Sequence, residues 1–193
     1  MVVPGNHDTG TDTMALARDG RGEGETLLQH ATLLRGEQVE VAGLRVAGLP
    51  HTLDPYQLTW WAHKAGEEEM ERRGAGVEGV QVLVSHSPPW GVADSNHTGV
   101  RCGSRGLGRG GGGLEVPPAL WVFGHIHECG GRSYRRGATT LVNASSCPLL
   151  GRGVRPPVVV DMVAATGEVL GVQAFRGEGG HTDPHPMDGL FDN

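Results

Sequence analysis

Residues 119–128 read Ala-Leu-Trp-Val-Phe-Gly-His-Ile-His-Glu, and this stretch decides the fold and the site that we expect. A short apolar run that ends at a glycine predicts a buried strand that opens into a loop. Side chains two positions apart on an extended backbone point the same way, so His125 and His127 can reach one point or two nearby points. Imidazole is the commonest metal ligand near neutral pH. Because an isolated His-x-His pair is weak evidence for a metal site, the rest of the chain decides its meaning.

Two other apolar runs end in the same way. Residues 1–4 precede Gly-Asn-His-Asp at positions 5–8, and residues 80–84 precede Ser-His-Ser-Pro-Pro at positions 85–89. In α/β proteins, ligands bind at the carboxyl ends of the strands. Three strand ends that each deliver a histidine or an asparagine therefore predict one shared site.

These three motifs resemble, in the right order, the third, fourth and fifth motifs of the calcineurin-like metallophosphoesterases. The resemblance runs from Val2 to about Gly171. Further stretches resemble the metallophosphoesterase-domain-containing subfamily typified by animal brain proteins: Ser85–Gly91, His97–Gly103 and Asn143–Cys147. The resemblance implies an α/β fold with a two-sheet β-sandwich flanked by helices. The family's Asp-x-His and Gly-Asp-x-x-Asp motifs, which precede Gly-Asn-His, have no counterpart in this sequence, so we expect a chain that lacks the N-terminal βαβ portion.

The same resemblance implies hydrolysis of a phosphomonoester or phosphodiester by metal-activated water. Asn6, His86 and His125 are expected to bind one metal ion, and His127 a second. Mn, Fe and Zn all suit mixed nitrogen and oxygen ligands. A complete site holds two ions, but the absent motifs supply the bridging carboxylate, so we expect one ion or none here. The chain is thus expected to be a C-terminal part of such an enzyme. The alternative is a catalytically inactive relative with at most one bound metal ion, acting as a binding module or without function.

Four further residues have candidate roles at this site. By resemblance, His7 is expected to contact the phosphate and to protonate the leaving oxygen. Asp8 is a candidate to orient the His7 imidazole, but it could equally be a turn or cap residue. His51 and His97 are candidates for the substrate pocket, with surface loop histidines as the alternative.

Periodicity and turn signals predict the remaining elements. Besides the strands at 80–84 and 119–123, we expect hairpins within 38–47, 132–142 and 157–174, and a helix over 56–73. Residues 1–175 are expected to form one partial phosphoesterase domain. Within it, the Gly- and Arg-rich segment 104–113 predicts a flexible insertion on a surface loop. The polar, Gly- and Pro-rich segment 176–193 predicts a disordered tail.

Composition limits the classes of partner. The net charge of −6 argues against general binding of nucleic acids or anionic membranes, and the expected partner is a small phosphoester. Three cysteines without Cys-x-x-Cys spacing indicate neither a disulfide framework nor a zinc knuckle. No transmembrane segment or signal peptide is visible, which predicts an intracellular protein, unless a missing N-terminus carried a targeting segment.

Overall fold

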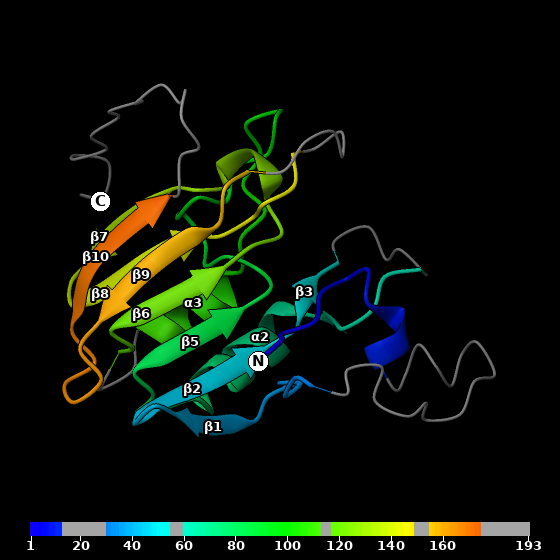
Figure 1. The fold of residues 1–193 in the computed structure, drawn as a ribbon. Helices are drawn as coiled ribbons and strands as arrows, with labels where there is room; N and C mark the ends of the chain where they lie inside the picture. Colours follow the sequence, from blue (N-terminus) through cyan, green and yellow to red (C-terminus); the bar gives the residue numbers. More distant parts are fainter. Residues whose placement is uncertain (13–29, 55–59, 113–116, 149–154, 175–193) are drawn as a thin grey trace.

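The computed structural model describes residues 1–12, 30–54, 60–112, 117–148 and 155–174. Its main element is a six-stranded sheet with the order β1-β2-β5-β6-β8-β7. The strands of this sheet are β1 (Gln38–Val41), β2 (Leu44–Leu49), β5 (Val82–Ser85), β6 (Leu120–Phe123), β7 (Ser133–Arg136) and β8 (Thr139–Asn143). Strands β2, β5, β6 and β8 run parallel, and β1 and β7 close the two edges as antiparallel hairpin partners. The carboxyl ends of these four parallel strands therefore lie at the same end of the sheet (Figure 1).

Both faces of the sheet are covered, because the parallel strands are apolar on both sides. Neighbouring residues of a strand point to opposite faces, so Leu83 belongs to one core cluster and Val82 to the other. One face carries α2 (Glu67–Ala75) and α3 (Arg105–Gly112). The other carries the hairpin of β9 (Val158–Met162) and β10 (Val169–Ala174), whose apolar side chains pack on the second cluster. Figure 1 shows the helices behind the sheet and this hairpin in front of it.

The three predicted hairpins are present. The β1–β2 turn is formed by Ala42 (φ 51°) and Gly43 (φ 81°), and two positive φ values in succession are the geometry that suits a two-residue hairpin turn. The β7–β8 and β9–β10 hairpins follow the same antiparallel pattern.

The prediction of a flexible loop at 104–113 is wrong for residues 105–112, which form α3. Its glycines allow close helix packing, because a Cβ on Gly106 would lie 2.2 Å from the carbonyl oxygen of Glu67. Leu107 is 1% exposed in the core. The Glu67 carboxylate accepts hydrogen bonds from Ser104 Oγ (2.6 Å), Arg105 N (3.0 Å) and Gly106 N (2.8 Å), and so satisfies the free donors at the start of α3.

The predicted helix over 56–73 is wrong for residues 60–66. Residues 55–59 lie outside the described residues, and the chain then forms a turn and the short strand β4 (Lys64–Ala65), which pairs with β3 (Thr52–Leu53). His63 has a left-handed backbone (φ 49°), which interrupts any helix. The helix α2 begins only at Glu67.

The α/β class is confirmed. The described residues contain one six-stranded sheet and two two-stranded sheets, so the two-sheet sandwich and the missing N-terminal portion stay predictions. The predicted tail at 176–193 lies outside the described residues. None of the helices in the described ranges has the length and apolarity needed to cross a bilayer.

Candidate metal centre

Three segments far apart in the sequence meet at the carboxyl ends of β5 and β6. His86 directly follows β5, and His125 follows β6 after Gly124. A hydrogen bond from Gly124 N to His86 O (3.1 Å) joins these two strand ends. Asn6 arrives from the segment before the 3-10 helix η1 (Thr9–Thr11), and its carbonyl oxygen accepts a hydrogen bond from Ala62 N (2.9 Å). The predicted meeting of three chain segments is therefore present in the structure.

The side chain of His86 is in direct contact with those of Asn6 and His125. His86 Nε2 lies 2.9 Å from Asn6 Oδ1 and 3.2 Å from His125 Nδ1. The two imidazole ring centroids are 4.8 Å apart, and Asn6 is 2% exposed. Nitrogen and oxygen ligands that bind one ion at about 2.0–2.2 Å lie roughly 3 Å from one another. Each of these two distances is thus close to that between neighbouring ligands around a single cation.

Two backbone features hold this arrangement. A Cβ on Gly5 would lie 2.3 Å from His86 Cε1, so only glycine lets the backbone approach this imidazole so closely. His125 has a φ of 66°, a left-handed conformation that is unfavourable for a residue with a Cβ. Strain of this kind costs about 1–3 kcal/mol and is typical of functional sites.

Burial keeps both imidazoles neutral. Desolvation lowers the pKa of His86 to about 3, and the neighbouring imidazoles, His125 first, lower it further. Desolvation likewise lowers the pKa of His125 to about 4, and His127 and His7 add to the effect. A neutral imidazole has a free lone pair, which is the form that binds a metal ion. At neutral pH these two residues therefore present nitrogen ligands rather than positive charge.

The donor set fits one divalent ion, with an amide oxygen and two neutral imidazoles. It contains no carboxylate. Among the described residues, no group of three or more His, Cys, Asp or Glu side chains has the geometry to hold a metal ion. Further ligands for such an ion would have to come from water or from a bound anion.

His7 and Asp8 lie next to this cluster but play different parts. His7 is exposed, and its ring centroid lies 5.4 Å from that of Trp60. Asp8 Oδ2 accepts a hydrogen bond from Gly5 N (2.7 Å), and Asp8 O accepts one from Thr11 Oγ1 (2.7 Å). Asp8 thus serves as a turn residue that closes the Gly-Asn-His-Asp loop, and its role in catalysis stays a prediction.

His127 is the first residue of the 3-10 helix η2 (His127–Cys129) and lies two residues after His125 in the chain. Its Nδ1 is buried without a hydrogen-bond partner in the described part of the chain. Its backbone oxygen accepts a hydrogen bond from Arg155 Nη1 (2.6 Å). The structure therefore places His127 near His125 without a hydrogen bond to Asn6 or His86, and its role as a metal ligand stays a prediction.

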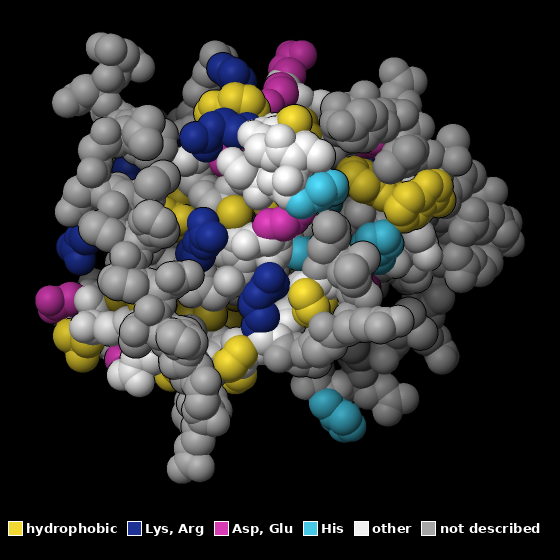
Figure 2. Space-filling model, turned by 90° about the horizontal axis from the view of Figure 1, so that it is seen from above, with side chains coloured by type: hydrophobic (Ala, Val, Ile, Leu, Met, Phe, Trp, Pro, Cys, Tyr) yellow, Lys and Arg dark blue, Asp and Glu magenta, His cyan; other side chains and the backbone are white. Residues whose placement is uncertain are grey.

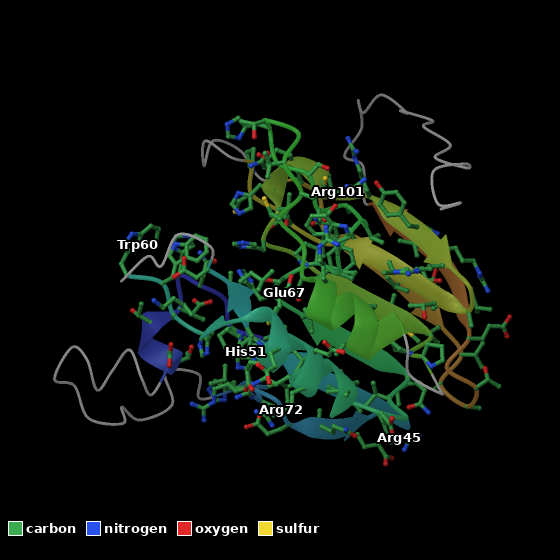
Figure 3. All side chains as sticks on the ribbon, turned by 180° about the vertical axis from the view of Figure 1, so that it is seen from behind. Arg45, His51, Trp60, Glu67, Arg72 and Arg101 are labelled. Carbon is green, nitrogen blue, oxygen red and sulfur yellow. The ribbon has the colours of Figure 1, made fainter. Side chains whose placement is uncertain are left out.

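The two predicted pocket histidines occupy different places: His51 follows β2, the strand next to β5, and His97 lies in the segment between β5 and α3. Burial, followed by the charge of Arg73 on α2, lowers the pKa of His51 to about 4, and Figure 3 labels His51 beside this helix. His97 is exposed, and its backbone N (2.7 Å) and Nδ1 (3.2 Å) contact Glu128 Oε1. His97 is thereby tied to the residue that follows His127. Seen from above, histidine side chains reach the surface close to acidic and basic ones (Figure 2).

Sequence reasoning missed three residues at this site. Trp60 contacts His7, and the ring of Trp61 lies edge-on to His125 with a centroid distance of 5.7 Å. Arg155 holds the loop that carries His127. The adjacent tryptophans were a visible signal in the sequence, whereas nothing in the sequence distinguishes Arg155 from the other arginines.

Comparison with known proteins identifies relatives of the chain. No family model matches the chain. The chain is 35% identical over 144 residues to metallophosphoesterase domain-containing protein 1 of Homo sapiens, a match that covers 72% of the chain and 42% of the human protein. A UPF0046 protein of Caenorhabditis elegans is 27% identical over 184 residues, covering 87% of the chain and 63% of the worm protein. This chain is a homologue of the metallophosphoesterase domain-containing proteins.

The relationship confirms the resemblance inferred from the three motifs. The chain spans about 42% of the length of its human metallophosphoesterase relative. Among solved structures, sulfate thiohydrolase SoxB of Thermus thermophilus matches with a TM-score of 0.44 and 14% identity, covering 88% of this chain and 32% of that one.

Proposed function

We propose that this chain carries a divalent-metal site of a phosphoesterase that hydrolyses a small phosphomonoester or phosphodiester. The observation that carries the proposal is the contact of Asn6 Oδ1, His86 Nε2 and His125 Nδ1 at 2.9 and 3.2 Å. Homology to the metallophosphoesterase domain-containing proteins supports the same class of reaction.

Each residue has a distinct part in this proposal. Asn6, His86 and His125 would hold the ion, which when bound supplies positive charge against the phosphoryl oxygens and a nucleophile at neutral pH. His7 is exposed beside this cluster, so its imidazole can reach a phosphoester from solvent and give a proton to the leaving oxygen. Asp8 keeps His7 in place indirectly, because its carboxylate closes the loop through Gly5 N.

We further propose that the chain holds one ion rather than two. Two unit charges about 4 Å apart repel by about 4 kcal/mol at an effective dielectric of about 20, so two divalent ions repel by roughly 16 kcal/mol. Anionic ligands normally offset this repulsion. The donors in contact here are an amide and two neutral imidazoles, which contribute no negative charge. A second ion at His127 would therefore require carboxylates from elsewhere.

Calorimetric titration of the full 193-residue chain with Mn²⁺ or Zn²⁺ tests the site. We expect one ion per chain, and loss of binding in His86→Ala. His30→Ala is the matched control, because His30 is exposed and outside the cluster. Tight binding of two ions per chain would contradict the single-ion proposal, and unchanged binding in His86→Ala would contradict the site itself. Turnover of bis(p-nitrophenyl) phosphate that requires Mn²⁺ and vanishes in His86→Ala would establish the reaction.

A second candidate function is a binding module without catalysis. The observation that favours it is the donor set, which has no carboxylate, together with the engagement of Asp8 in the turn. This candidate predicts one bound ion without measurable turnover. The titration and the turnover assay together separate the two functions.

A further inference from the structure

Trp60 is a large apolar side chain left in water beside the candidate metal centre. It is 53% exposed, although an indole gains more from burial than most side chains. Figure 3 shows Trp60 at the outer side of the segment that leads into β4, away from α2 and α3. Single exposed apolar residues are common on protein surfaces and need no explanation. Trp60 differs because its ring contacts that of His7, the predicted phosphate-contacting residue.

The Trp60 ring is held in a defined position by its neighbours. Its centroid lies 5.4 Å from that of His7, and the two rings are inclined by only 31°, an arrangement close to stacking. Its other contact is edge-on, with the ring of Trp61 at 5.8 Å and 88°. Trp61 in turn lies edge-on to the ring of His125. A continuous row of rings thus connects His7 with the metal-binding imidazoles.

These contacts leave much of the indole open to solvent while its orientation is set. Aromatic rings attract one another in offset-stacked geometry, and stacking on a protein ring tolerates any flat π-system. A phosphoester bound at His7 would place its ester group next to Trp60, because the two rings are neighbours. A flat ring in that ester group would then find a preformed partner.

We propose that Trp60 is a stacking platform for a planar aromatic group carried by the phosphoester. The site then selects aryl- or nucleobase-bearing esters over aliphatic ones of similar size. This inference rests on the proposed function, since it needs a phosphate group bound near His7. Trp60 recognises the ester group, whereas Asn6, His86 and His125 hold the ion and His7 gives the proton.

Binding of non-hydrolysable phosphonates to the full chain in Mn²⁺ tests the proposal. Phenylphosphonate and cyclohexylphosphonate are similar in size, but only the first is flat. We expect the wild-type chain to prefer phenylphosphonate by about 5- to 160-fold, because one stacked ring contributes about 1–3 kcal/mol. Trp60→Leu should remove most of this preference and leave the affinity for inorganic phosphate within about two-fold, and Trp60→Phe should retain part of the preference. Leu170→Ala is the control, since Leu170 is 65% exposed on β10.

The outcomes separate this inference from the proposed function. Equal affinity of the wild-type chain for both phosphonates, or a preference that survives in Trp60→Leu, overturns the stacking platform alone. Failure of inorganic phosphate and of both phosphonates to bind overturns the platform and the phosphoesterase proposal together. Because Trp60 is exposed, its variants are expected to fold, and circular dichroism checks this directly.

Discussion

Replacement of Gly5 by alanine should displace the central imidazole of the site. The added Cβ would lie 2.3 Å from His86 Cε1 and 2.4 Å from His86 Nδ1, whereas ordinary van der Waals contact begins at 3.4 Å. The imidazole or the loop must therefore move by about 1 Å. A shift of that size would stretch the 2.9 Å contact between His86 Nε2 and Asn6 Oδ1 beyond hydrogen-bonding range.

Two quantities should change in Gly5→Ala. Overpacking of a buried site costs about 1–3 kcal/mol, so the free energy of unfolding in urea should fall by that amount. Disturbed ligand orientation typically lowers metal affinity by about 10–100-fold, which calorimetric titration with Mn²⁺ would measure. The unfolding measurement does not depend on metal and stands by itself.

The matched control is Gly171→Ala. A Cβ at Gly171 would meet no heavy atom within 4 Å, so this change should leave metal affinity nearly unaltered and affect stability less. If Gly5→Ala kept wild-type stability and bound Mn²⁺ with wild-type affinity, the close approach of Gly5 to His86 would not organise the site, and our account of its geometry would be wrong.

Three further predictions concern the fold and its response to acid. Glu67→Ala should lower the free energy of unfolding in urea by about 1–2 kcal/mol, because the start of α3 loses its carboxylate partner. Glu68→Ala is the control, since Glu68 lies in the same first turn of α2 without these contacts. Asn143→Leu should lower the free energy of unfolding by about 2–5 kcal/mol in the same assay. The buried Asn143 amide donates to Ala93 O (3.1 Å) and Ile126 O (3.0 Å), and both carbonyls would lose this partner. Wild-type stability of the variant would contradict this role. The metal-free chain should lose stability as the pH falls from about 6.5 toward 4. In the folded chain, the pKa values of His86 (about 3) and His125 (about 4) lie below the ordinary histidine pKa of about 6.5, so the unfolded chain takes up more protons in that window. Each histidine then lowers the free energy of unfolding by about 1.4 kcal/mol per pH unit. Urea unfolding near pH 7 and near pH 5 checks this, and equal stability at the two pH values would rule it out.

The sequence by itself determined most strands of the main sheet, the hairpins and the three residues that meet at the candidate metal centre. Apolar runs such as 119–123 and turn residues such as Ala42-Gly43 act through the local backbone, so their effect can be read over a few positions. Parallel strands in one sheet present their carboxyl ends on the same side, and this geometric rule by itself predicts that His86 and His125 meet.

Only the tertiary structure decided which contacts each of these residues makes. The Gly-rich segment 105–112 is a helix because α2 offers a surface for Gly106 and a carboxylate for its first donors. Asp8 closes a turn, and Trp60 contacts His7 across more than fifty residues of chain. Local propensity carries no information about a partner that distant, since the energy of such a contact exists only after the intervening chain has folded and its conformational entropy has been lost.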